Sequence, residues 1–355
     1  RHVRTARATL LPDALDPADP RPVRRSAKGT MWTFILRRAA QSVLVIFGVT
    51  LITFLALQMG GDPTYLYVSE RASTEEIERT RATLGFDRPL HVQYLSFVGG
   101  LLQGDIGRSL TYRTSALEVV LERFPATIEL TIFAMLIALS SAIPLGILAA
   151  RARGTSLDGS IMAFAMLGQS IPNFWLGLML ILFVGLGLGW LPISGHVPVL
   201  GPLFRGEFGV AWTNFPRAIP YLLMPAFTIS LFSMSRNARL VRSSMLEVLG
   251  QDYVRTARSK GVSEYTVTMS HALRNALMPV VTMIGLEFGF LLSGVVVVET
   301  VFSWPGVGRL VFNAINQRDI PLVQAAVIVF SMIFVVLNLI VDVVYARLDP
   351  RVRLA

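Results

Sequence analysis

The chain has 355 residues, of which 53% are hydrophobic and only 15% are charged. Soluble domains carry about a quarter charged residues, so this composition predicts a membrane protein and excludes an ordinary soluble enzyme or binding domain. The net charge of +9 comes from arginines spread between apolar stretches, which argues against a nucleic-acid-binding face. Cysteine is absent and the four histidines lie far apart in the sequence, so we predict neither disulfides nor a metal site.

The first 61 residues divide into a polar extension and an apolar stretch. Residues 1–30 are rich in Arg, Pro and Asp, and we expect a disordered or non-native extension that ends before Met31. Residues 39–61 carry no charged side chain and are long enough to cross a bilayer, so residues 31–61 are predicted to form the first transmembrane helix. A cleaved signal peptide is the alternative; it is disfavoured because the run is long and no small-residue cleavage site follows it.

Five further apolar runs complete a prediction of six transmembrane helices in an all-α membrane protein. They lie at residues 130–150, 159–190, 218–235, 275–298 (broken only by Glu287) and 320–341. An even number of spans places both termini on one side, and that side carries 21 of the 32 Lys and Arg residues. The positive-inside rule therefore predicts that both termini are cytoplasmic. Prolines that can kink these helices lie at 144, 172, 225 and 279.

Residues 62–125 are too long for a simple connection between spans, and we expect a helical cap on the extracytoplasmic side. Ser73 and Glu76 form a capping-box pattern, and Gly85 can end the helix that they begin. A second amphipathic helix is expected over residues 92–102. The sequence leaves two roles open for this cap: contact with an extracytoplasmic partner, or a lid packed on the spans.

Residues 247–279, the polar segment, form the longest polar interruption in the second half of the chain. Leu249, Tyr253 and Ala257 share one face of a predicted helix. Gly261 suits a left-handed helix cap, and Ser263 suits the start of a second helix. We therefore expect two short helices at an angle, set within a core domain of residues 126–355.

A few polar residues within the apolar runs are candidates for a translocation path. Glu287 lies about halfway along its run, where a carboxylate is costly unless it is paired or wet. We expect it to line a path or to form a hydrogen bond between helices, with Ser170 and Asn173 as further lining candidates. Glu299 is a second ionisable group of interest, whereas Glu129, near the end of a run, is expected in the membrane interface.

Motifs for chemistry are missing from the chain. It has no G-x-x-x-x-G-K-[ST] phosphate loop, no G-x-S-x-G and no H-E-x-x-H. We therefore predict that the protein is not an enzyme and holds no cofactor. A transport protein of this kind takes its energy from a partner subunit or from an ion gradient.

Several sequence blocks closely resemble one family. The polar segment reads DYVRTARSKG over residues 252–261 and HALRNALMPVV over residues 271–281. Both resemble the coupling loop of permease subunits of bacterial ATP-binding-cassette (ABC) importers, in the dipeptide and oligopeptide branch. Similar blocks, which look like the first permease of the pair, are LGFDRPLHVQYLSFVGGLLQGDIGRSL, ERFPATIELT, SIPNFWLGL, GWLPISG, ETVFSWPGVGRL and LDPRVRL. The resemblance implies the type I importer permease fold and a place in the bacterial inner membrane.

The same resemblance implies partners and a set of contact residues. The partners are a second permease, two cytoplasmic ATPase subunits, an extracytoplasmic substrate-binding protein and membrane lipid. The ATPase-coupling residues are Tyr253, Val254, Arg255, Thr256, Ala257, Arg258, Lys260 and Gly261. In the wider class this loop carries Glu-Ala-Ala four residues before its Gly; here only Ala257 matches, because Arg255 and Thr256 occupy the first two positions.

Within the coupling residues, we expect Tyr253, Val254 and Ala257 to be apolar anchors in a groove of the ATPase and Arg255, Arg258 and Lys260 to form a polar rim. An amphipathic helix lying on the membrane surface is the alternative for this segment. The alternative for the whole protein is a proton-coupled secondary transporter that uses Glu287. Substrates of the resembling permeases range over dipeptides, oligopeptides, nickel chelates, glutathione and opines.

Overall fold

A computed structural model describes residues 31–58, 62–69 and 71–348. The extension predicted for residues 1–30 lies outside these ranges. The described residues contain helices and no β-strand, as expected for the all-α class, and the only β-type pairing among them is an isolated bridge between Arg108 and Ser115. In chain order the elements are α1 (Met31–Gln58), a 3₁₀ turn (Pro63–Leu66), α2 (Thr74–Leu84), α3 (Leu90–Leu102), α4 (Ala116–Arg151), α5 (Ser156–Ser170), α6 (Asn173–Leu180), a π-helix (Ile181–Gly187), α7 (Leu200–Phe204), α8 (Phe208–Leu249), α9 (Asp252–Ser259), α10 (Glu264–Thr266), a π-helix (Val267–Ala272), α11 (Leu273–Ala276), α12 (Met278–Val301), α13 (Val307–Asn316) and α14 (Ile320–Leu348).

Within the described residues, most of each of the six apolar runs is helical. In the described part of the chain, α4, α8 and residues 320–340 of α14 are each long and apolar enough to cross a membrane alone. The pair formed by α5 and α6 with its π-helical extension passes the same test together. The other two runs lie on α1, of 28 residues, and on α12, of 24 residues. The six-span count remains a prediction.

The run at residues 159–190 is bent, where the sequence predicted a single span. Its two halves, Ser156–Ser170 and Asn173–Gly187, meet at 103°. Ile171 and Pro172 between them have extended backbone, with ψ of 123° and 134°. Proline lacks an N–H and disfavours helical geometry in the residue before it, so the Ile171–Pro172 pair breaks the helix.

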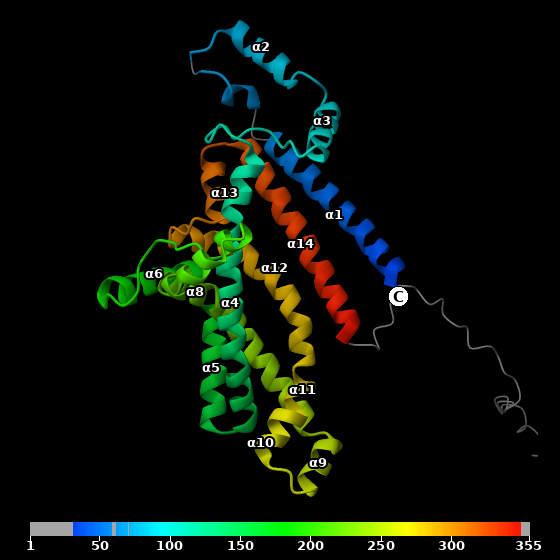
Figure 1. The fold of residues 1–355 in the computed structure, drawn as a ribbon, viewed down its shortest axis with the longest axis vertical. Coiled ribbons are helices and arrows are strands. Elements are labelled where there is room, and N and C mark those ends of the chain that lie inside the picture. The colour runs from blue at the N-terminus through cyan, green and yellow to red at the C-terminus, as the bar shows by residue number, and fades with distance from the viewer. Residues whose placement is uncertain (1–30, 59–61, 70, 349–355) are drawn as a thin grey trace, which may run out of the picture.

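Two long helices, α4 and α8, pack along each other and organise the rest of the chain. Figure 1 shows α2 and α3 at one end of the molecule and α9 and α10 at the opposite end, with α4 running between them. One buried cluster joins α4, α8 and α12 around Trp304. A second joins α4, α13 and α14 beneath the cap, so the interior consists of successive layers along these long helices.

The expected cap helices are present. Ser73 accepts a hydrogen bond from Glu76 N at 3.3 Å, α2 ends at Leu84, and Gly85 is left-handed with φ of 73°. α3 covers the second predicted helix and is attached to α1, because the hydroxyls of Tyr94 and Thr50 lie 2.9 Å apart.

The loop after α3 is bound to the corner between α13 and α14. The carboxylate of Asp319 is fully buried and accepts hydrogen bonds from Ser109 Oγ at 2.5 Å and from Thr111 N at 3.0 Å. The same side chain accepts a hydrogen bond from Leu322 N at 3.3 Å, in the first turn of α14. One carboxylate therefore joins the cap to the start of the last helix.

Candidate functional site

The polar segment folds as the sequence predicted, with a break between two helical arms. α9 is followed by Gly261 in the left-handed conformation, with φ of 77°. Ser263 then caps α10 by accepting a hydrogen bond from Thr266 N at 3.3 Å. Glycine adopts positive φ without the steric cost that other residues incur, so the chain can reverse direction at this position.

Two polar contacts fix the angle between the arms. Arg258 binds Glu264 through two hydrogen bonds, of 2.7 and 3.3 Å, across the turn. This contact lowers the pKa of the Glu264 carboxyl, so its stabilising effect is present at neutral pH and is lost as pH falls through that lowered pKa. The Tyr253 hydroxyl accepts a hydrogen bond from Asn275 Nδ2 at 2.7 Å and so connects α9 with α11.

The predicted coupling residues differ in how much of each is exposed. Val254 is fully buried, so the expectation that it is a surface anchor is wrong; its burial stabilises the fold of the segment. Arg258 also contributes to the internal structure through Glu264. The side chain of Arg255 is 77% exposed. Residues that remain available at the surface are Tyr253, Arg255, Thr256, Lys260 and Gly261, with Ala257 half-buried.

The second arm of the polar segment is built into the core of the protein. Ala272 and Ala276 are fully buried and pack in one cluster with residues of α4, α8 and α12. The main partners of this arm are Ile147, Val241, Met245 and Val280. A displacement of α9 that keeps the arms together is therefore transmitted to α4 and α8, because close-packed side chains do not compress.

α8 carries side chains that bind polar groups on α5. Arg242 donates to both carboxylate oxygens of Asp158, at 2.6 and 2.7 Å, and the Arg239 guanidinium donates to Gln169 Oε1. Sequence reasoning did not identify these pairs. For the Asp158–Arg242 pair, the sequence shows only that each residue lies near the end of a separate apolar run. This position does not show that the two ends are neighbours in the fold.

The three candidate path residues do not form one cluster. Glu287 is buried between helices and accepts a hydrogen bond from Asn237 Nδ2 on α8, which is the inter-helix role that the sequence allowed. Ser170 is exposed at the end of α5, and its hydroxyl donates to Met166 O at 3.1 Å. Asn173 begins α6 beside Gly294 of α12. No hydrogen bond joins any two of these side chains in the part of the chain that the structure describes.

Glu299 is the centre of a buried contact at the cap end of α12. Thr127 Oγ1 donates to it at 2.7 Å and Arg309 N at 2.9 Å. Trp304 Nε1 in turn donates to Ala126 O at 2.9 Å, and Val307 N donates to Thr127 Oγ1 at 2.8 Å. Two sequence blocks singled out above, residues 122–131 and 299–310, are thus joined in space.

Glu129 is buried inside the protein near the end of its apolar run. Its Oε2 accepts hydrogen bonds from the backbone N–H groups of Val199 and Leu200, at 3.2 and 3.3 Å. His196 lies 3.6 Å from the same oxygen and packs edge-on against Trp304. The loop before α7 is therefore held against α4 by a carboxylate whose partners are far away in the sequence.

Comparison with known families covers nearly the whole described chain. Residues 142–354 match the family described as "Binding-protein-dependent transport system inner membrane component". Residues 31–131 match the N-terminal domain family of the same membrane components. The chain belongs to this permease family. It is accordingly a multi-pass protein of the inner membrane, and the polar segment lies within the first of these matches.

Two curated relatives of this permease are similar along their full length. The di/tripeptide transport system permease protein DppB of Pseudomonas aeruginosa (strain UCBPP-PA14) is 40% identical over 337 residues, which cover 91% of this chain and 99% of DppB. The dipeptide transport system permease protein DppB of Escherichia coli (strain K12) is 40% identical over 340 residues, with the same coverage. A crystal structure of an amino acid ABC transporter with histidines aligns with 65% of this permease at 12% identity and a TM-score of 0.46, a likeness that decides nothing about the fold.

In this permease, we expect Asp158→Asn to weaken the coupling between α5 and α8. The substitution keeps the shape of the side chain but removes the negative charge that the Arg242 guanidinium binds. An arginine that donates to both oxygens of a carboxylate makes one of the stronger polar contacts in proteins. The purified transporter should melt at a lower temperature and respond less to substrate in an ATP hydrolysis assay. The charge exchange Asp158→Arg with Arg242→Asp should recover part of both losses; if Asp158→Asn changes neither, the pair has no coupling role.

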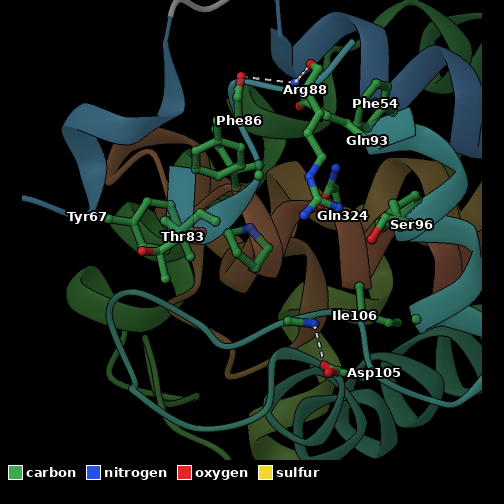
Figure 2. A pocket seen from close by; sticks show the side chains of 17 residues that line it. Phe54, Tyr67, Thr83, Phe86, Arg88, Gln93, Ser96, Asp105, Ile106 and Gln324 are labelled. Atoms are coloured by element: carbon green, nitrogen blue, oxygen red, sulfur yellow. Dashed lines mark hydrogen bonds between the residues drawn. The ribbon is translucent and has the colours of Figure 1, made fainter. Parts of the chain in front are cut away.

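A pocket of about 560 Å³ lies at the cap end of the permease. Figure 2 shows that it is lined by the loop after α2, by α3 and by the first residues of α14. The pocket lies at the opposite end of the molecule from the polar segment, and it shares none of the candidate path residues.

Proposed function

We propose that this chain is the membrane-spanning permease subunit of an ATP-driven, binding-protein-dependent importer of peptides or peptide-like solutes. The observation that supports this most is the polar segment, in which an exposed first arm is fixed to a second arm packed among α4, α8 and α12. The family match of the chain and its similarity to DppB proteins of dipeptide transport systems support the same function.

In this proposal the exposed part of α9 seats in a groove of a cytoplasmic ATPase subunit. Tyr253, Arg255 and Lys260 offer the exposed ring and positive charges that such an interface uses, while Val254 keeps the arm rigid. When two ATPase subunits close on ATP, they would displace the polar segment. The second arm would carry this displacement into the long helices, so that a central path opens to one side of the membrane at a time.

The proposed topology has six transmembrane helices in the type I importer fold with both termini cytoplasmic. Residues 31–61 would form the first span, residues 62–125 the extracytoplasmic cap, and residues 126–355 the core domain. The cap would face a substrate-binding protein, and a second permease of the same family would complete the path. The separate binding protein would choose the peptide, because Ser170, Asn173 and Glu287 do not converge in this chain into a site of defined chemistry.

The test is ATP hydrolysis by the complex that co-purifies with a tagged copy of this chain. We expect ATPase subunits to be present and their activity to rise when binding protein loaded with a dipeptide is added. Empty binding protein is the control. Purification of the chain alone, together with proton-driven uptake in vesicles that Glu287→Gln abolishes, would instead establish the secondary-transporter alternative.

A further inference from the structure

The pocket at the cap end has two chemically different sides. Phe54 of α1, Phe97 of α3 and Ile106 give it an aromatic and aliphatic wall. Arg88 and Asp105 give it one positive and one negative group. A cavity of about 560 Å³ is within the range that holds a small ligand or a lipid headgroup, and its two sides suit an amphiphile.

Arg88 is the side chain in this pocket that indicates an anionic ligand. Figure 2 shows its side chain extending into the cavity toward Gln324, from the loop that joins α2 to α3. Within the described residues the guanidinium makes no ion pair, whereas Arg81 on α2 pairs with Asp62. A guanidinium presents a planar set of donors that matches phosphate and carboxylate oxygens.

Asp105 supplies the opposite charge and retains capacity to bind. Its Oδ1 accepts a hydrogen bond from Gly107 N at 2.9 Å, which orients the side chain beside the cavity. The other carboxylate oxygen can accept from an ammonium group. The pocket therefore offers one site for an anion and one for a cation, as a zwitterion requires.

The position of the pocket favours a lipid over a soluble zwitterion. It lies where α1 ends and α14 begins, and Figure 1 shows these two helices side by side along the edge of the molecule. Phe54 itself is buried against Tyr94 and Phe97, whereas Ile52 and Leu55 on another face of α1 are exposed. In an inner membrane protein, an exposed apolar helix face of this kind is in contact with lipid chains.

We propose that this pocket binds the headgroup of a zwitterionic phospholipid of the phosphatidylethanolamine type. The phosphate is bound by Arg88, the ammonium group by Asp105, and the glycerol and first acyl carbons lie against Phe54 and Phe97. The lipid joins the cap to the α1–α14 edge and stabilises the cap in its observed place. Of the earlier conclusions about function, this proposal uses only the location in the inner membrane. It does not depend on which substrate is transported.

The test is native mass spectrometry of the full chain in its purified complex, taken from nanodiscs of phosphatidylethanolamine and phosphatidylglycerol. We expect one retained phosphatidylethanolamine per permease chain. Arg88→Gln should lower that occupancy about tenfold, the effect of losing one charge-assisted contact. Arg79→Gln is the matched control, because Arg79 is an exposed arginine of α2 that does not line the pocket.

Ser96→Phe provides a second variant that leaves the charges unchanged. Ser96 lies on the exposed side of α3 and lines the cavity, so a phenyl ring there should displace the lipid without unfolding the helix. Unchanged lipid occupancy in both pocket variants would overturn the proposal. Soluble glycerophosphoethanolamine binding as tightly as the lipid would overturn it, and so would a dipeptide retained in an Arg88-dependent way in place of lipid.

Discussion

Gly261→Val should abolish the stimulation of ATP hydrolysis by loaded binding protein, and transport with it, while the chain still inserts into the membrane. Gly261 has φ of 77°, a conformation that costs other residues about 1–2 kcal/mol and is especially unfavourable for a β-branched side chain. A Cβ at this position would meet no atom of the described residues within 4 Å, so the strain comes from the backbone. Relief of that strain would turn α9 away from α10 and separate Arg258 from Glu264.

The chain offers a matched control for this experiment. Gly206, in the turn between α7 and α8, has φ of 79°, and a Cβ there would likewise meet no atom of the described residues within 4 Å. Gly206→Val therefore introduces the same backbone strain at a turn outside the polar segment, and coupling should survive it. Gly261→Asn should retain part of the activity, since Asn tolerates this conformation. Undiminished coupling in both Gly261→Val and Gly206→Val would show that the polar segment does not transmit the ATPase cycle.

Gly306→Ala should prevent the chain from reaching its stable fold. A Cβ at Gly306 would lie 2.0 Å from Glu299 Oε1, so the buried carboxylate would have to move away from Thr127 and Arg309. Each buried hydrogen bond lost in this way costs about 1–3 kcal/mol. Gly306 has φ of −95°, which any residue can adopt, so the requirement for glycine is one of space. Expression and melting temperature in detergent measure the effect.

A double-mutant cycle identifies Glu299 as the cause. If the added methyl group acts by displacing the carboxylate, Gly306→Ala should cost little once Glu299→Ala has removed it. Gly209→Ala is the control, because in the described part of the chain no atom lies within 4 Å of a Cβ at Gly209 of α8. A melting temperature for Gly306→Ala that equals the control would rule out the packing argument.

The features that sequence analysis predicted are those determined by neighbouring residues. The cap of α2 at Ser73 and its end at Gly85 depend on side chains within a few positions, as does the reversal at Gly261. A helix cap is a local contact between a side chain or a glycine and the adjacent backbone. Such contacts form wherever the pattern occurs, so the pattern was sufficient.

The features that sequence analysis missed depend on which helices become neighbours in the folded protein. Val254 was expected at the surface, yet it is fully buried in a short helix that packs against both α8 and the π-helix of the second arm. The hydrogen-bond partners of Glu129 are two backbone N–H groups at the start of α7, 70 and 71 positions away in the sequence. Pro172 marked a place where the run can kink, but the 103° angle was not predicted, because apolarity continues through Pro172 into α6. Hydropathy indicates whether a segment can enter the membrane. It does not indicate whether the helix changes direction within that segment.

The buried carboxylate of Asp319 affects how this protein can vary. Ser109 and Thr111 belong to the cap, whereas Asp319 and Leu322 belong to the corner before the last helix, more than 200 positions later. A polar group left behind in such a buried place is destabilising, so a change on one side requires a matching change on the other. These two distant stretches therefore constrain one another: a chimaera whose parents differ at Ser109 or Asp319 would leave a buried polar group without its partner.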